Sequence, residues 1–143
     1  MWGPRSFIAG IPVVTSHSES TPYRTRFSAA GHEAYSDASE PKGGAGAGVG
    51  PHALLVGSVA CCITIWLRMY ADKNESPLSG VAGDVRLNRE SPGATTFEWA
   101  VTLEGNLTPE QRNRLREQVD SCPVSQTLLK EISFREMSAL RDF

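Results

Sequence analysis

Three cysteines are the residues of this chain best suited to chemistry. Cys122 directly precedes Pro123 at a predicted helix start, where backbone N–H groups and the helix dipole favour a thiolate. Cys62 lies in a long apolar segment, where lost hydration raises a thiol pKa unless a cation comes from elsewhere. Cys61 lies about 100° round the same helix, so we expect it to pack rather than share a site with Cys62. This pattern indicates thiol redox chemistry, with a buried structural cysteine as the alternative for Cys62.

A metal site would need a different spacing of ligands. His32, His52 and the three cysteines include neither a C-x-x-C nor an H-x-x-x-H pair. We therefore expect no bound metal and no cofactor. The glycine-rich stretch 36–50 lacks the Gly-Lys-Ser/Thr ending of a P-loop, so we expect a flexible connection rather than a nucleotide site.

Composition argues against several classes of protein. A chain of 143 residues with a formal net charge of −2 predicts one domain, and its 14 basic residues are spread along the sequence, which disfavours a nucleic-acid partner. The first residues have a lone Arg5 and prolines at positions 4 and 12, unlike a signal peptide, so we expect a cytoplasmic protein. Cysteines in a cytoplasmic chain favour redox use over a disulfide framework.

The longest apolar segment, residues 51–72, must position Cys62. Pro51 suits the first position of a helix. Apolar residues recur at alternating steps of four and three, the period of a helix face, at Leu55, Val59, Cys62, Trp66 and Met69. The uncharged run 53–67 is shorter than the roughly 18 residues of a membrane span, so we predict a largely buried core helix and no membrane partner.

Strands and further helices flank this segment in the sequence. We predict a hairpin of strands at 23–29 and 32–36, and an antiparallel pair at 81–87 and 97–103. A helix should begin at Thr108 and be interrupted at 121–123, followed by a short helix and a last strand at 132–134. This order predicts an α+β domain over residues 23–143. Residues 1–22 read as an arm that is disordered or covers a partner.

Two segments resemble the OsmC/Ohr family of thiol peroxidases, GPHALLVGSVACCITIWLRMYADKNESPL at 50–78 and GNLTPEQRNRLREQVDSCPVSQTLL at 105–129. The resemblance extends over about residues 23–132 and implies an OsmC-like fold in an intertwined homodimer. It implies that Cys62, before Arg68, attacks an organic hydroperoxide and becomes a sulfenic acid. Cys122 then resolves it to a disulfide, which a dithiol such as a lipoyl group reduces.

The chain departs from the family's pattern at two places. A glutamate usually follows the helix-opening proline and orients an arginine towards the reactive sulfur, but His52 and Ala53 occupy those positions. An arginine often precedes the histidine of the HEAYSD segment, where this chain has Gly31. The residues that could support the thiolate instead are Arg24, Arg26 and His52.

Two other functions stay open. A catalytically weak or silent family member would be a dimer that binds a small hydrophobic ligand or partner, with its cysteines as packing. A dithiol–disulfide oxidoreductase acting on proteins would need an accessible Cys122. The first discriminating observation is whether Cys62 and Cys122 approach within disulfide reach.

Overall fold

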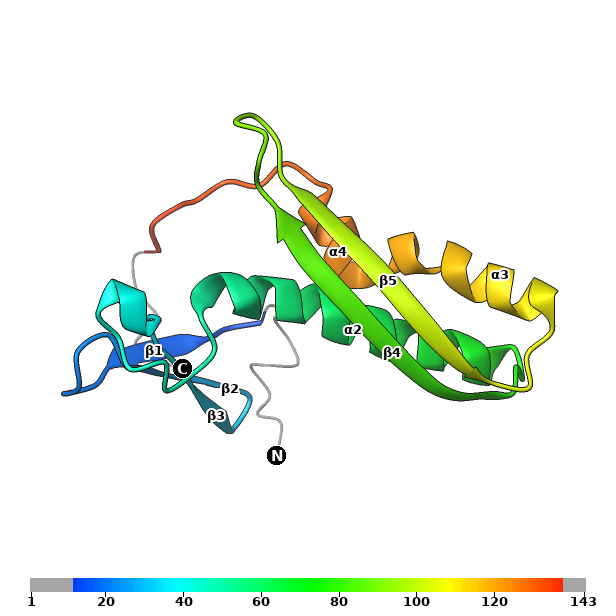
Figure 1. Ribbon diagram of the computed structural model, residues 1–143, viewed down its shortest axis with the longest axis horizontal. Helices are drawn as coiled ribbons and strands as arrows, with labels where there is room; N and C mark the ends of the chain where they lie inside the picture. Colours follow the sequence, from blue (N-terminus) through cyan, green and yellow to red (C-terminus); the bar gives the residue numbers. More distant parts are fainter. Residues whose placement is uncertain (1–11, 138–143) are drawn as a thin grey trace. The chain divides into compact units, whose positions relative to one another are not determined.

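The computed structural model describes residues 12–137, which form two compact units (Figure 1). The first unit comprises residues 12–54 with 134–137, and the second comprises residues 55–133. The first contains β1 (Thr15–Ser18), β2 (Thr25–Ala29), β3 (His32–Ser36) and the 3-10 helix η1 (Glu40–Lys42). The second contains most of α2 (Pro51–Lys73), then β4 (Leu78–Asn88), β5 (Thr96–Gly105), α3 (Pro109–Glu117), the 3-10 helix η2 (Val119–Ser121) and α4 (Pro123–Leu128). Antiparallel strands combined with helices confirm the predicted α+β class.

The first unit is built on a three-stranded antiparallel sheet in the order β1-β2-β3. β2 and β3 form the predicted hairpin, and its two turn residues, Ala30 and Gly31, have positive φ values of 50° and 80°. Such a turn matches the right-handed twist of the strands. β1 lies within the predicted arm, in a polar TSHS sequence without the apolar alternation that indicates a strand. Residues 1–11 of that arm lie outside the described residues.

The glycine-rich segment after β3, which we expected to be a flexible connection, wraps around the carboxylate of Asp37. The backbone N–H groups of Ala38, Ala45 and Ala47 donate to this carboxylate at 2.8, 3.1 and 3.0 Å. The hydrogen bond from Ala47 is the largest of the effects that lower the pKa of Asp37. A buried, charged acceptor therefore holds this loop together.

Replacing Asp37 with asparagine is expected to loosen the loop, because a single neutral oxygen would replace a carboxylate that accepts three N–H groups. The Ala45 and Ala47 amides should exchange with solvent about tenfold faster at neutral pH, as measured by NMR. Because the pKa of Asp37 is lowered in the folded state, its stabilising contribution is present at neutral pH and is lost as the pH falls through that lowered pKa. Asp37→Asn should lack this acidic transition.

The matched control is Asp72→Asn, which makes the same change at an exposed position of α2. It should keep both the slow exchange of the loop amides and the acidic transition. Unchanged amide exchange in Asp37→Asn would show that the carboxylate does not hold the loop.

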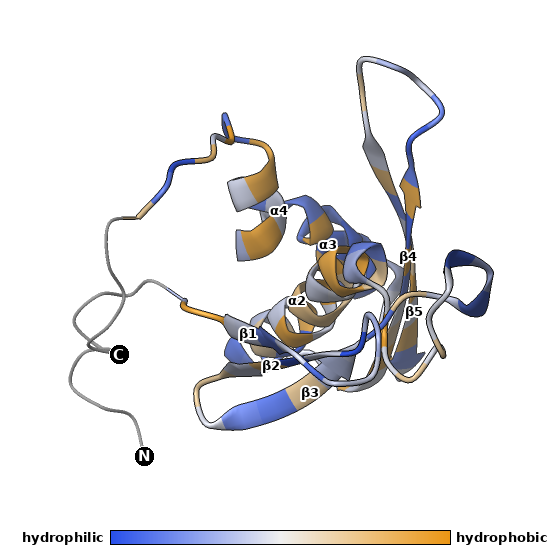
Figure 2. Ribbon diagram, turned by 90° about the vertical axis from the view of Figure 1, so that its left-hand side faces the viewer, coloured by the Kyte–Doolittle hydropathy of each residue, from blue (hydrophilic) through white to orange (hydrophobic). Residues whose placement is uncertain are grey.

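In the second unit, helices pack against one face of the β4–β5 hairpin, and the hydropathy colouring in Figure 2 shows apolar stretches on both strands and on the helices. The strands pair antiparallel from Leu78 opposite Gly105 to Asn88 opposite Thr96. The buried apolar core consists of Val59, Ile63, Leu67, Ala71, Leu78, Leu103, Leu107, Leu115, Val119 and Cys122. These side chains come from both strands, from three helical elements and from the segments just before α3 and α4, so burial of their apolar surface holds the unit together.

Helix α2 turns a different face to the core from the one predicted. Its buried residues recur at steps of four, at Val59, Ile63, Leu67 and Ala71. Leu55 and Met69 of the predicted stripe are 40% and 60% exposed, so the prediction of a largely buried helix is wrong for the single chain. By length and composition α2 could also cross a membrane, a test that the core helix of a soluble protein passes as well. Apolar residues all round a helix leave its buried face undetermined by period alone.

Helix α3 begins as predicted, with Thr108 as its N-cap. The Thr108 hydroxyl accepts from the N–H of Gln111 at 3.1 Å, and the Gln111 side chain accepts from the N–H of Thr108 at 2.9 Å. The strand predicted at 132–134 is wrong, because residues 131–137 have no regular structure. Phe134 is 98% exposed, so no packing within the described chain holds this segment as a strand.

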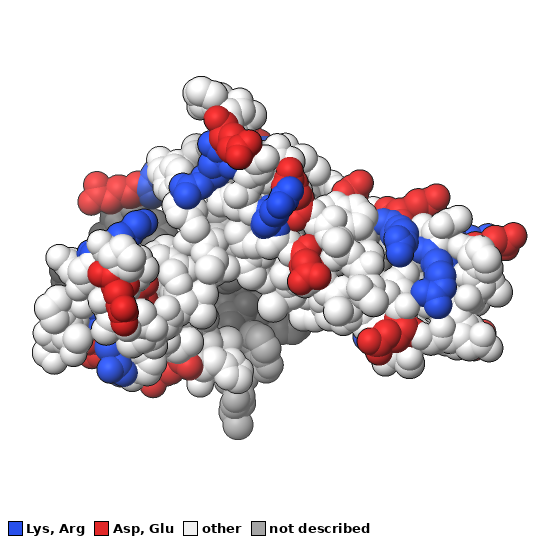
Figure 3. Space-filling model, in the orientation of Figure 1, with Lys and Arg blue, Asp and Glu red and all other residues white. Residues whose placement is uncertain are grey.

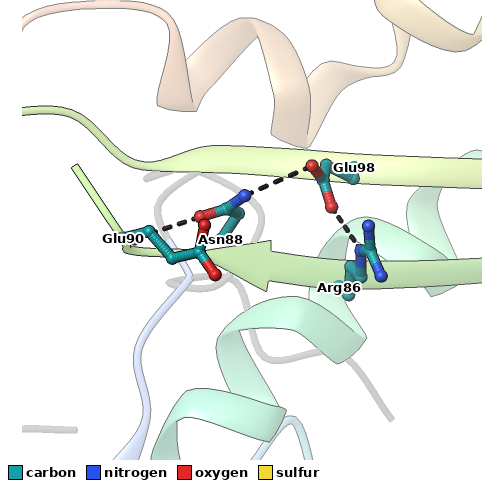
Figure 4. Close-up of polar contacts among 4 residues, drawn as sticks. All are labelled: Arg86, Asn88, Glu90 and Glu98. Carbon is teal, nitrogen blue, oxygen red and sulfur yellow. Dashed lines mark hydrogen bonds and ion pairs between the residues drawn. The ribbon is translucent and has the colours of Figure 1, made fainter.

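The outer surface of the β4–β5 hairpin carries polar side chains in cross-strand contact (Figure 4). The Arg86 guanidinium donates to the carboxylate of Glu98, which lies opposite it in the register. Asn88 donates to the same carboxylate at 3.4 Å and accepts from the N–H of Glu90 at 3.0 Å. The Arg86 contact is the main cause that lowers the pKa of Glu98. On the face drawn in Figure 3, basic and acidic side chains alternate over this hairpin.

Candidate functional site

Two thiols from distant parts of the sequence meet in the second unit. Cys62 lies near the middle of α2, and Cys122 is the N-cap of α4, directly before Pro123. The N–H of Val124 donates to Cys62 Sγ at 3.5 Å, and the Cys122 thiol lies near enough to influence the pKa of Cys62. The start of α4 therefore lies against α2 and brings Cys62 and Cys122 together.

The surroundings of Cys62 disfavour its thiolate. Burial is the largest effect and raises the pKa of the Cys62 thiol, because the charged form loses hydration. The N–H of Val124 lowers this pKa by donating to the sulfur, while the neighbouring Cys122 thiol raises it further. The net direction is upward, as expected for a sulfur in apolar surroundings.

Cys122 is fully buried and is held by a residue of the following turn. Its Sγ lies 3.0 Å from the Oγ of Ser125, and the N–H of Ser125 donates to the same sulfur at 3.5 Å. Ser125 was not among the predicted site residues. The C-P-V-S spacing was the available signal, because the third residue after an N-cap is the usual donor to the capping side chain. A buried Cys122 also does not meet the requirement of an oxidoreductase that acts on other proteins.

Cys61 stands apart from the thiol pair. It is exposed, so the expectation that it packs in the core is wrong for this chain. The rotation of about 100° per residue carries its side chain from the face of Cys62 towards solvent. Among residues 12–137, no group of three or more His, Cys, Asp or Glu side chains is placed to hold a metal ion.

The three residues predicted to support the reactive sulfur lie in the first unit. The Arg24 guanidinium lies 4.3 Å from the centre of the Tyr35 ring, and Arg26 forms an ion pair with Glu33 at 3.4 Å. Both arginines thus have partners on the neighbouring strand β3. His52 lies in the first turn of α2. Support of the thiolate by any of these residues stays a prediction.

Arg68, which follows Cys62 in the apolar segment, hydrogen-bonds to the backbone at the start of β4. Its guanidinium donates to the backbone C=O of Leu78 at 2.5 Å and to that of Ser79 at 3.1 Å. These two bonds tie α2 to the start of β4. The arginine therefore fixes the helix that carries the thiol.

The fold has known relatives. A family model described as OsmC-like protein matches residues 43–136, which is more than half of the chain. Structural likeness extends to a Psychrobacter arcticus protein provisionally assigned to osmotic stress and detoxification responses, with 20% identity over 82% of this chain and 88% of that chain and a TM-score of 0.69. An OsmC like protein of Mycoplasma pneumoniae has 15% identity over 82% and 86% of the two chains, with a TM-score of 0.69. An organic hydroperoxide resistance protein of Elizabethkingia anophelis has 16% identity over 83% and 88%, with a TM-score of 0.61. No curated protein matches the chain.

Proposed function

Because the chain belongs to the OsmC-like protein family, we propose that it reduces organic hydroperoxides to alcohols, with Cys62 as the attacking thiol and Cys122 as the resolving thiol. A stress-related redox role is supported by structural neighbours that are named for organic hydroperoxide resistance. The observation that carries the proposal is the approach of Cys62 to the start of α4, where Cys122 is the N-cap and the N–H of Val124 donates to Cys62 Sγ at 3.5 Å. A disulfide cycle needs such a contact, because a second thiol must reach the oxidised sulfur.

The proposed cycle begins when the Cys62 thiolate attacks an oxygen of the hydroperoxide. The O–O bond breaks, the alkoxide takes up a proton and leaves as the alcohol, and Cys62 becomes a sulfenic acid. Cys122 then attacks the Cys62 sulfur, an S–S bond replaces the S–O bond, and water is released. A dithiol of the lipoyl type reduces this disulfide by exchange and is itself oxidised to a disulfide.

The raised pKa of Cys62 means that its thiolate needs further support. In this proposal Arg24, Arg26 or His52 supplies it within a homodimer. Association with a second copy is favoured by apolar side chains that α2 exposes, Ile65 at 55% and Met69 at 60%. The proposal also places the protein in the cytoplasm, where dithiol reductants keep cysteines reduced.

Intact-mass spectrometry after one equivalent of cumene hydroperoxide tests the proposal. The wild type is expected to lose two hydrogens, with the bridge mapped to Cys62 and Cys122 and with Cys61 left free. In Cys122→Ser, the reaction should stop after one turnover, with dimedone trapping Cys62 as its sulfenic acid. Cys61→Ser is the matched control and should behave as the wild type does. Three free thiols in the treated wild type would sink the proposal.

That negative result would favour a second function, the binding of a small hydrophobic ligand by a catalytically silent family member. The first unit contains an apolar cavity of about 410 Å³, lined by Val14, Phe27, Pro51 and Leu54 together with three hydroxyl residues of the sheet. Cavities of this size and character hold small molecules in many proteins. Saturable binding of an apolar fluorescent probe to the peroxide-inert protein would support this function, and no binding would reject it.

A further inference from the structure

The hydroxyl of Ser125 contacts the sulfur of Cys122, and the proposed cycle assigns no role to this contact. Its Oγ lies 3.0 Å from Cys122 Sγ, and the N–H of the same residue donates to that sulfur at 3.5 Å. Cys122 has no exposed surface, and Ser125 is half-buried. One residue thus gives a buried sulfur two polar contacts, and the one from the side chain can be removed without changing the backbone.

Successive residues at the start of α4 contact different sulfurs. The N–H of Val124 donates to Cys62 Sγ at 3.5 Å, whereas Ser125 contacts Cys122. The attacking sulfur therefore accepts from one backbone N–H, whereas the resolving sulfur is contacted by both the backbone N–H and the hydroxyl of Ser125. Removal of that hydroxyl can therefore alter disulfide formation by Cys122 without removing any group that contacts Cys62 during its attack on the peroxide.

We propose that Ser125 is a positioning residue for the resolving step, and that its hydroxyl holds the Cys122 sulfur and donates a hydrogen bond to its thiolate. This inference rests on the proposed hydroperoxide cycle. In the resolving step the Cys122 thiolate forms the S–S bond with Cys62 sulfenic acid and the S–O bond breaks. The departing hydroxide takes up the proton that Cys122 released and leaves as water.

Two physical effects follow from this contact. A hydroxyl that donates to a thiolate stabilises the charged form, and the thiolate is the nucleophile in disulfide formation. The contact also restricts rotation of the Cys122 side chain, so that its sulfur stays near Cys62. Removing the hydroxyl should weaken both effects at once.

Thr127 provides a matched control on the same short helix. Its hydroxyl donates to the backbone C=O of Pro123 at 3.0 Å, so it is engaged with the helix backbone rather than with a sulfur. Thr127→Val removes this hydroxyl and keeps the shape of the side chain. Ser125→Thr serves as the rescue variant, because it retains a hydroxyl beside Cys122.

After one equivalent of cumene hydroperoxide, Ser125→Ala should form the disulfide about tenfold more slowly than the wild type, with more Cys62 sulfenic acid trapped by dimedone. The initial loss of the Cys62 thiol should be unchanged. The pH at which disulfide formation reaches half its maximal rate should rise by about one unit, which a merely structural role would not cause. Ser125→Thr and Thr127→Val should resemble the wild type. Disulfide formation in Ser125→Ala at the wild-type rate and with the wild-type pH profile would overturn the proposal.

A second measurement separates this proposal from the proposed function. In a Cys61→Ser/Cys62→Ser variant Cys122 is the sole thiol, and its rate of alkylation by iodoacetamide at fixed pH reports the reactivity of its sulfur. Adding Ser125→Ala should slow this alkylation about tenfold, and an unchanged or faster alkylation would overturn the role of Ser125. The alkylation uses no peroxide, so it tests the role of Ser125 separately from the proposed function, which a wild type that forms no disulfide would reject.

Discussion

The Cys62→Ser variant is expected to consume no cumene hydroperoxide above the uncatalysed background, whereas the wild type turns over in the presence of a dithiol. A serine hydroxyl stays protonated in the physiological pH range and attacks peroxide oxygen poorly, so the first step of the cycle loses its nucleophile. Peroxide consumption with dihydrolipoate as reductant is the measurement. The expected effect is the complete loss of enzymatic turnover, the largest that any single substitution should cause.

Cys61→Ser is the control for that variant, since it makes the same chemical change one residue earlier, at an exposed position. It should keep the wild-type rate, and equal rates in the two variants would contradict the choice of Cys62 as the attacking thiol. Because burial raises the pKa of Cys62, the wild-type rate should rise with pH towards that pKa. If one of Arg24, Arg26 and His52 supports the Cys62 thiolate, its replacement should shift the rise in rate to higher pH, because the thiolate loses a stabilising group.

Leu67→Ala is expected to lower the free energy of unfolding by about 3 kcal/mol, because Leu67 has no exposed surface and lies within the core of the second unit. Urea unfolding followed by circular dichroism at fixed protein concentration measures this change. Leu129→Ala removes the same atoms from a side chain that is 76% exposed and should cost at most about 0.5 kcal/mol. Similar losses in the two variants would contradict the burial pattern.

Patterns between residues close in sequence predicted most of the fold. The β2–β3 hairpin, the alternation along β4 and the cap at Thr108 each depend on near neighbours, and each is confirmed. β1 was not predicted, because its four polar residues show no apolar alternation. The buried face of α2 was misplaced because apolar residues surround that helix, and the strands and helices packed on it select Ile63 and Leu67 rather than Met69.

The site was harder to predict than the fold. The local surroundings of Cys62 and Cys122 could be inferred, but their contact joins distant segments, and the family resemblance alone suggested it. Asp37 was not predicted because hydrogen bonds to a carboxylate leave no periodic pattern in the sequence. Ser125 was missed although the C-P-V-S spacing carries the signal of an N-cap contact. Gly31 has a positive φ of 80° in the tight β2–β3 turn, and this conformation disfavours a larger side chain such as the arginine that the family resemblance led us to expect there.

The bond from Val124 to Cys62 joins residues that are 62 positions apart in the chain. A covalent cross-link between Cys62 and Cys122 would close a ring of about 60 residues and remove chain entropy worth about 4 kcal/mol from the unfolded state. By a thermodynamic cycle, formation of the disulfide from the two thiols would then be more favourable in the folded protein than in the unfolded chain, by the same amount of about 4 kcal/mol. A reductant that restores the thiols therefore has to work against the fold itself, and a chain loosened by heat or denaturant would release the cross-link more readily.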